Sequence, residues 1–176
     1  KKFLRNMSSE LSSVIDTVTR FSLAYNDIAF KLTSDGKVMI YSAKSEDEKN
    51  AIYSIYGSET AKNLIKIDFE GEMIKIVGYI GKPIIARSDK TRQSIYINGR
   101  YVKSKEIADA VKQGYQSMLF LDREPVYVLK VELDESKVDV NVHPRKEIVK
   151  ISSSKEICNR ISDAIAGVLR ESNLVV

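Results

Sequence analysis

The apolar residues of the chain recur with two periods, one typical of helices and one typical of strands. Spacings of three and four predict amphipathic helices over 8–25, 105–120 and 154–171, and a shorter helix over 46–56 that Gly57 ends. The first helix should bury one stripe, formed by Leu11, Val14, Ile15, Val18 and Phe21. The next long helix should bury Ile107, Val111, Tyr115 and Met118, and the last should bury Ile157, Ile161, Ile165, Val168 and Leu169.

Alternating apolar and polar residues predict strands between these helices. One hairpin is expected over 28–41 around an Asp-Gly turn, and a second over 64–80 around Gly71. Further strands are expected over 94–98 and 126–133. The mixture of hairpins and helical crossovers favours α+β, a two-layer mixed β-sheet with helices on one face. We expect a single domain over 1–176, with a leading helix in 1–25 and a terminal helix in 152–176.

The stretch 138–151 (VDVNVHPRKEIVKI) has the most unusual pattern. Strand alternation before Pro144 and after Glu147 predicts a charged turn with a strand on each side, because proline cannot donate to a β ladder. Such a turn would hold Lys146 at a fixed position. Lys146 is then either an ordinary surface lysine or a point charge for a phosphate held by another domain. The spacing alone does not choose between these readings.

Composition excludes several functional classes. Hydrophobic residues make up 43% and charged residues 30% of the 176 residues, as in globular proteins. The sequence contains no apolar run long enough to span a membrane and no signal peptide at its start. Cys158 is the only cysteine, which fits a reducing compartment, the cytoplasm or the nucleus. One cysteine and one histidine, His143, argue against a zinc site, and no Gly-rich phosphate loop is present. We therefore expect no metal and no self-sufficient active site.

Basic residues are concentrated in one part of the chain. Between Lys82 and Lys105, seven basic residues face one acidic residue, a net of +6, whereas the whole chain carries +4. Asn98-Gly99 predicts a tight turn that holds Arg100 at a sheet edge beside Arg92 and Lys103. Such a rim would bind DNA backbone without reading bases, although exposed basic residues are also ordinary solvated surface.

Several of these segments resemble the MutL family of DNA mismatch repair proteins. The resemblance rests on GYIGKPIIARSDKTRQSIYINGRYV, on the helix that follows it, and on VDVNVHPRKEIV. The opening KKFLRNMSSE resembles the segment that follows the family's ATPase domain, and we expect the chain to be part of something longer.

The resemblance implies a transducer domain, with a left-handed β-α-β crossover as in type II topoisomerases. It implies that Lys146 contacts the γ-phosphate of ATP, with Mg²⁺, in an upstream ATPase domain of the same protein, and that Arg100 lies in a DNA-binding groove. Asn98, Gly99, His143 and Pro144 would shape the two turns. Arg92, Lys103 and Arg145 are DNA-binding candidates by charge alone. The expected partners are DNA, a MutS-type mismatch recognition protein and a second protomer, identical or related.

Three alternatives stay open at this point. The chain could be the transducer of another type II topoisomerase-like ATPase, a stand-alone nucleic-acid-binding module, or an interaction domain whose basic rim binds nothing. Duplex binding measured across a salt series would distinguish the last of these.

Overall fold

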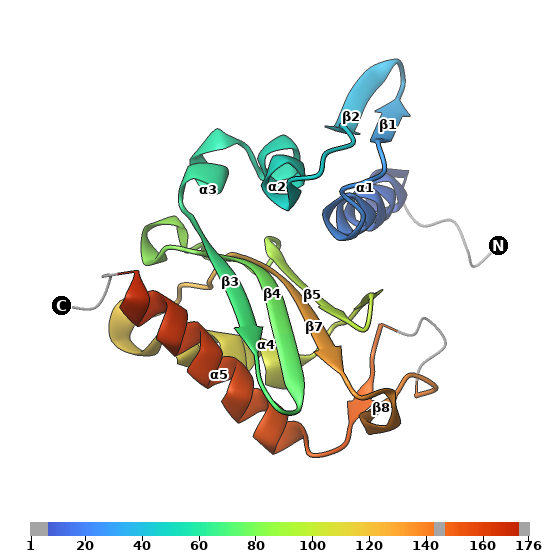
Figure 1. Cartoon of the computed structure of the whole chain (residues 1–176). Coiled ribbons are helices and arrows are strands. Elements are labelled where there is room, and N and C mark those ends of the chain that lie inside the picture. Colours follow the sequence, from blue (N-terminus) through green and yellow to red (C-terminus); the bar gives the residue numbers. More distant parts are fainter. Residues whose placement is uncertain (1–6, 143–146, 173–176) are drawn as a thin grey trace. The chain divides into compact units, whose positions relative to one another are not determined.

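The computed structural model describes residues 7–142 and 147–172, which divide into two compact units at residues 62 and 63 (Figure 1). This division into compact units does not test the single domain predicted over 1–176, which stays a prediction.

The first unit contains three helices and one hairpin. Helix α1 (Met7–Ala24) is followed by strands β1 (Phe30–Ser34) and β2 (Lys37–Ser42), then by α2 (Glu48–Tyr56) and α3 (Ser58–Lys62). Asp35 and Gly36 both have positive φ angles and form the predicted two-residue turn. The Asp47 side chain accepts a hydrogen bond from the Lys49 backbone N–H and caps α2, which ends at Gly57 as predicted.

The predicted buried stripe of α1 is wrong in part. Val14 and Phe21 are 45% and 50% exposed, whereas Leu23 is buried. Phe21 stacks on Tyr25, which is also exposed. The helical period is therefore right, but a two-stranded hairpin and short helices cover only part of an 18-residue helix within this unit.

The second unit is built on a five-stranded mixed sheet in the order β3-β4-β7-β5-β6. Its strands are β3 (Leu64–Glu70), β4 (Ile74–Gly81), β5 (Gln93–Ile97), β6 (Arg100–Tyr101) and β7 (Tyr127–Leu133). All neighbouring pairs are antiparallel except β5 and β7, which are parallel. Helix α4 (Lys105–Gly114) lies in the connection between these two strands, so a β-α-β crossover is present. The left hand predicted for it stays a prediction.

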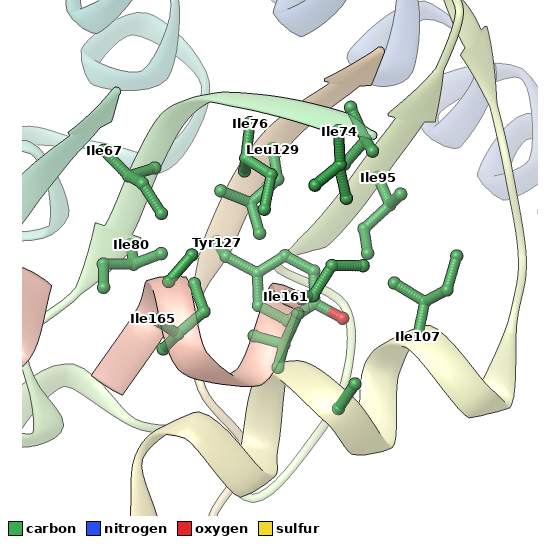
Figure 2. Packing of buried hydrophobic residues seen from close by; sticks show 14 of the residues in the cluster. Ile67, Ile74, Ile76, Ile80, Ile95, Ile107, Tyr127, Leu129, Ile161 and Ile165 are labelled. Atoms are coloured by element: carbon green, nitrogen blue, oxygen red, sulfur yellow. The ribbon is translucent and has the colours of Figure 1, made fainter. Parts of the chain in front are cut away.

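Two helices supply the second layer, on one face of the sheet as predicted. Helices α4 and α5 (Ser154–Glu171) pack on each other, and α5 also contacts β3 and β4 (Figure 1). Figure 2 shows isoleucines of the strands pointing toward Ile107 of α4 and toward Ile161 and Ile165 of α5. These three helical residues are at most 1% exposed, in agreement with the predicted stripes.

Helix α4 is shorter than the predicted 105–120. It ends at Gly114, and a 3₁₀ turn, η2 (Gln116–Met118), follows. The chain leaves the helix at Gln116, whose φ angle of 52° is left-handed, and Gly114 allows close packing because a Cβ there would lie 2.6 Å from the Ile165 side chain. The buried Tyr115 hydroxyl donates to the Gly81 carbonyl at 2.6 Å, and burial raises the pKa of this hydroxyl.

The strands on either side of Pro144 are also shorter than expected. Among the described residues of 138–151, the pairing is confined to Val138–Asp139 (β8) and Lys150–Ile151 (β9), a two-residue antiparallel ladder after the 3₁₀ turn η3 (Glu135–Lys137). Another 3₁₀ turn, η1 (Pro83–Ile85), follows β4. Alternation over 138–142 thus overestimated the length of the strand, since residues 141 and 142 form a turn and Val142 is exposed.

Candidate nucleic-acid interface

The turn between β5 and β6 is fixed by its own residues. Asn98 and Gly99 have φ angles of 48° and 80°, and Ile97 pairs with Arg100 across them. Both positive angles match a type I′ hairpin turn, which Asn-Gly favours. This geometry makes Arg100 the first residue of a strand, directly after a tight turn.

The Asn98 side chain also ties this turn to the neighbouring strand. Its Nδ2 donates to the Leu133 carbonyl at 3.0 Å, and its Oδ1 accepts from the Leu133 N–H at 2.9 Å. The Asn98 backbone N–H donates to the Val131 carbonyl at 2.9 Å. The amide therefore continues the β5–β7 ladder beyond the end of β5, and the base of the turn is rigid.

Replacing Asn98 with alanine should lower the free energy of unfolding by about 2 kcal/mol, because both polar groups of Leu133 lose their partner. Asn98→Asp should cost about as much, since a carboxylate still accepts from the Leu133 N–H but sets its second oxygen against the Leu133 carbonyl oxygen in place of the donor Nδ2. Urea unfolding followed by circular dichroism measures both. An alanine variant as stable as the parent chain would show that the two hydrogen bonds contribute nothing.

Arg100 and Arg92 do not lie side by side. Arg92 immediately precedes β5 and Arg100 faces its last residue, so the length of the strand, about 17 Å, separates them. The expectation that Arg100 lies beside Arg92 and Lys103 on one rim is therefore corrected, because β6 runs back along β5 and carries Lys103 away from the turn.

Much of the basic excess of 82–105 is balanced by carboxylates. Lys103 pairs with Glu147 at 2.9 Å, Lys90 with Glu124 at 4.0 Å, and Lys105 with Asp109. Arg87 donates to both carboxylate oxygens of Asp89, and hydrogen bonds from Arg87 and Thr91 hold the pKa of Asp89 below its usual range. Counting charge within 82–105 included Asp89 but missed Asp109, Glu124 and Glu147, which lie outside that segment.

Arg100 differs from its basic neighbours. Its side chain is exposed, and it makes no ion pair with any residue in 7–142 or 147–172. Lys82 also has no ion pair within those ranges but is half-buried. An exposed guanidinium on a rigid turn, with no carboxylate to displace, is well suited to a phosphate.

Lys103 lines a shallow groove of about 330 Å³ beside β5 and the start of α4. Lys90, Gln93, Lys105 and Tyr127 contribute to the same groove. The Lys103 amine lies 5.9 Å from the centre of the Tyr101 ring. All three lysines of the groove have a carboxylate partner, which leaves little net charge there. The groove is therefore a weaker anion site than the Arg100 turn.

Four candidate residues, His143, Pro144, Arg145 and Lys146, lie outside the described residues. The residues on either side of them are well anchored. Asp139 accepts a hydrogen bond from the Asn141 N–H, and the Glu147 carbonyl accepts one from the Lys103 N–H at 2.6 Å. Sequence reasoning did not select Glu147, whose contacts with Lys103 span 44 residues of sequence and have no local signal.

The described residues contain neither a metal-binding cluster nor a membrane-spanning helix. Within 7–142 and 147–172, no group of three histidine, cysteine or acidic residues could hold a metal ion. Among the helices in those ranges, none is long and apolar enough to cross a membrane. Burial raises the pKa of the Cys158 thiol, and a raised pKa disfavours the reactive thiolate.

A sequence model of the DNA mismatch repair protein, C-terminal domain, matches residues 52–170. The chain belongs to the MutL family. It is 38% identical over 174 residues to the MutL proteins of Streptococcus mutans and Streptococcus sanguinis, covering 99% of this chain. It spans 27% of the length of these relatives.

Solved structures of related proteins share the fold. The N-terminal domain of a DNA repair protein aligns with a TM-score of 0.80 at 20% identity, over 97% of this chain and 56% of that one. The ATPase domain of Aquifex aeolicus MutL aligns with a TM-score of 0.66 at 13% identity, over 93% and 55%. The same domain complexed with ADP aligns with a TM-score of 0.57 at 18% identity, over 76% and 46%. These likenesses agree with the predicted transducer-type α+β fold.

Proposed function

We propose that this chain is the transducer part of a MutL-type ATPase, which acts in DNA mismatch repair and binds DNA without sequence preference. The observation that carries this proposal is Arg100, exposed at a turn that Asn98 fixes to β7 and without an ion pair in the described chain. Family membership supplies the context of mismatch repair.

The contact at Arg100 would be made with a DNA phosphate rather than a base. A guanidinium at a sheet edge offers a fork of donors to phosphate oxygens, and such contacts carry no sequence information. Arg92, Lys103 and Arg145 would add to the binding, each by less where a carboxylate competes with the phosphate, as Glu147 does at Lys103. Affinity should therefore be low and should fall steeply as salt increases.

The second role belongs to Lys146, which we propose contacts the γ-phosphate of ATP in the longer protein. ATP and its Mg²⁺ would be held by the ATPase domain and not by this chain. One support is that the ATPase domain of Aquifex aeolicus MutL, of similar fold, has been solved in complex with ADP. Another is the anchoring of Glu147 to Lys103, which fixes the residue next to Lys146.

The first unit would pack against that ATPase domain. Val38, Tyr41 and Phe21 are between 50% and 59% exposed, an unusual apolar surface for so small a unit. The β1–β2 pair has no third strand among the described residues, and two-stranded sheets are marginal alone. Other parts of a protein as long as the curated relatives would cover this surface. A second protomer, identical or related, and a MutS-type recognition protein would complete the assembly.

Reversing the charge of Arg100 tests the DNA contact. Arg100→Glu should weaken binding to any duplex about tenfold at low salt, because an attraction to phosphate becomes a repulsion. Arg160→Glu, which makes the same charge change at an exposed position of α5, should alter binding less than twofold. Fluorescence anisotropy with several duplexes measures both. Equal losses in the two variants, or a loss confined to particular sequences, would contradict the proposed site.

A further inference from the structure

Strand β3 forms one edge of the five-stranded sheet. All seven of its residues pair with β4 on one side. On the other side, residues 64–70 make no backbone hydrogen bond to any residue in the described ranges. An edge of this length is a template for another strand, because its outward N–H and C=O groups are ready to pair.

The side chains of β3 are arranged to match a second copy of the strand. Lys66 and Asp68 are exposed on the same face, and neither forms an ion pair with a described residue. Ile65 and Phe69 are only partly buried on the opposite, core-facing side, and Ile67 between them is fully buried. The strand therefore has one positive and one negative residue at equal distances from Ile67.

We propose that β3 pairs with β3 of a second copy of this chain, antiparallel and around a two-fold axis at Ile67. In this register Lys66 of each copy faces Asp68 of the other, and Ile65 faces Phe69. Axes at Lys66 or Asp68 would instead set like charges opposite each other. A shift of pairing by one residue would place charged side chains opposite core-facing ones. An axis at Asp68 would also set Lys66 opposite Glu70, but of these three axes only the one at Ile67 avoids a like-charge pair. The result is a continuous sheet shared by two copies.

A second copy fits this edge better than an unrelated strand does. A two-fold axis repeats every contact, so both opposite-charge pairs and both Ile65–Phe69 pairs form at once. Helix α5 contacts β3 and β4 on the core side of the sheet (Figure 1), so the two copies of α5 would extend the helical layer beside the extended sheet. Neither the DNA contact at Arg100 nor the role of Lys146 is needed for this pairing.

Exchanging the charges of Lys66 and Asp68 tests the pairing register of β3. Sedimentation velocity of the 176-residue chain at low salt should show a concentration-dependent dimer. Lys66→Glu and Asp68→Lys should each weaken dimerisation about tenfold, because each converts two attractive cross-strand pairs into repulsive ones. The double variant K66E/D68K restores opposite charges and should dimerise within about threefold of the parent chain. Circular dichroism should show unchanged folding, since both side chains are exposed.

The proposal fails if the chain stays monomeric up to millimolar concentration, or if the double variant remains as weak as the single ones. A second measurement applies in a Cys158→Ser background. A mixture of K66C and D68C chains should form a disulfide between the two kinds of chain faster than either chain forms one with itself, because directly opposite Cβ atoms lie closer than diagonal ones. Equal rates in all three samples would also overturn the proposed register.

Discussion

Replacing Gly78 with alanine should lower the free energy of unfolding by about 3 kcal/mol or more. Gly78 lies in β4 opposite Leu129. Its φ angle is +132°, a backbone conformation that is strained for any residue with a side chain. A Cβ at this position would lie 2.2 Å from the Val128 carbonyl oxygen. Because that atom is backbone in the neighbouring strand, neither strand can move away without breaking the β4–β7 ladder.

Gly167 provides the matched control. It lies within α5, and a Cβ there would meet no atom within 4 Å. Gly167→Ala should therefore raise stability by about 0.5–1 kcal/mol, the difference in helix propensity between the two residues. Thermal and urea unfolding of both variants gives the comparison. Two variants of equal stability would contradict the account of the β4–β7 contact.

Replacing Lys146 with alanine should lower the rate of ATP hydrolysis about a hundredfold in a protein that contains the ATPase domain. The expected cause is the loss of a cation at the γ-phosphate, where negative charge develops in the transition state. Nucleotide binding should change much less, so kcat should fall with little change in KM. A coupled assay of phosphate release over a range of ATP concentrations measures both constants.

Lys150→Ala is the control for that experiment. Lys150 is an exposed lysine of β9, four residues beyond Lys146 in the sequence, and it pairs with Asp139 of β8. Its loss should leave kcat within about twofold. If Lys146→Ala turns over ATP as fast as the parent protein, Lys146 is not the sensor of the terminal phosphate.

Much of the fold could be predicted from local pattern. The two hairpins, α2 and α5 follow from apolar period, turn dipeptides and capping residues, which act within a few residues of sequence. Prediction failed where distant contacts decide the outcome. Gly114 packs closely on Ile165, a contact that the local pattern over 105–120 does not contain. Val14 and Phe21 of the α1 stripe are exposed because the size of this unit, and not the helical period, limits burial.

For the candidate site, too, local features could be predicted and contacts between distant residues could not. The Asn98-Gly99 turn could be predicted from a dipeptide, but the amide contact with Leu133 spans 35 residues of sequence and could not. Local counting of charge found the basic segment and missed the carboxylates of Glu124 and Glu147, which pair with Lys90 and Lys103. Only the folded chain distinguishes Arg100, which has no such partner among the described residues.

The salt dependence of duplex binding tests the central claim, a phosphate contact at Arg100, most directly. The slope of log Kd against log salt counts the phosphates that the protein neutralises, at about 0.9 for each contact on duplex DNA. Arg100→Ala should reduce that slope by about one contact, equally for every duplex sequence. A slope identical to that of the parent chain would contradict the claim, because Arg100 would then neutralise no phosphate.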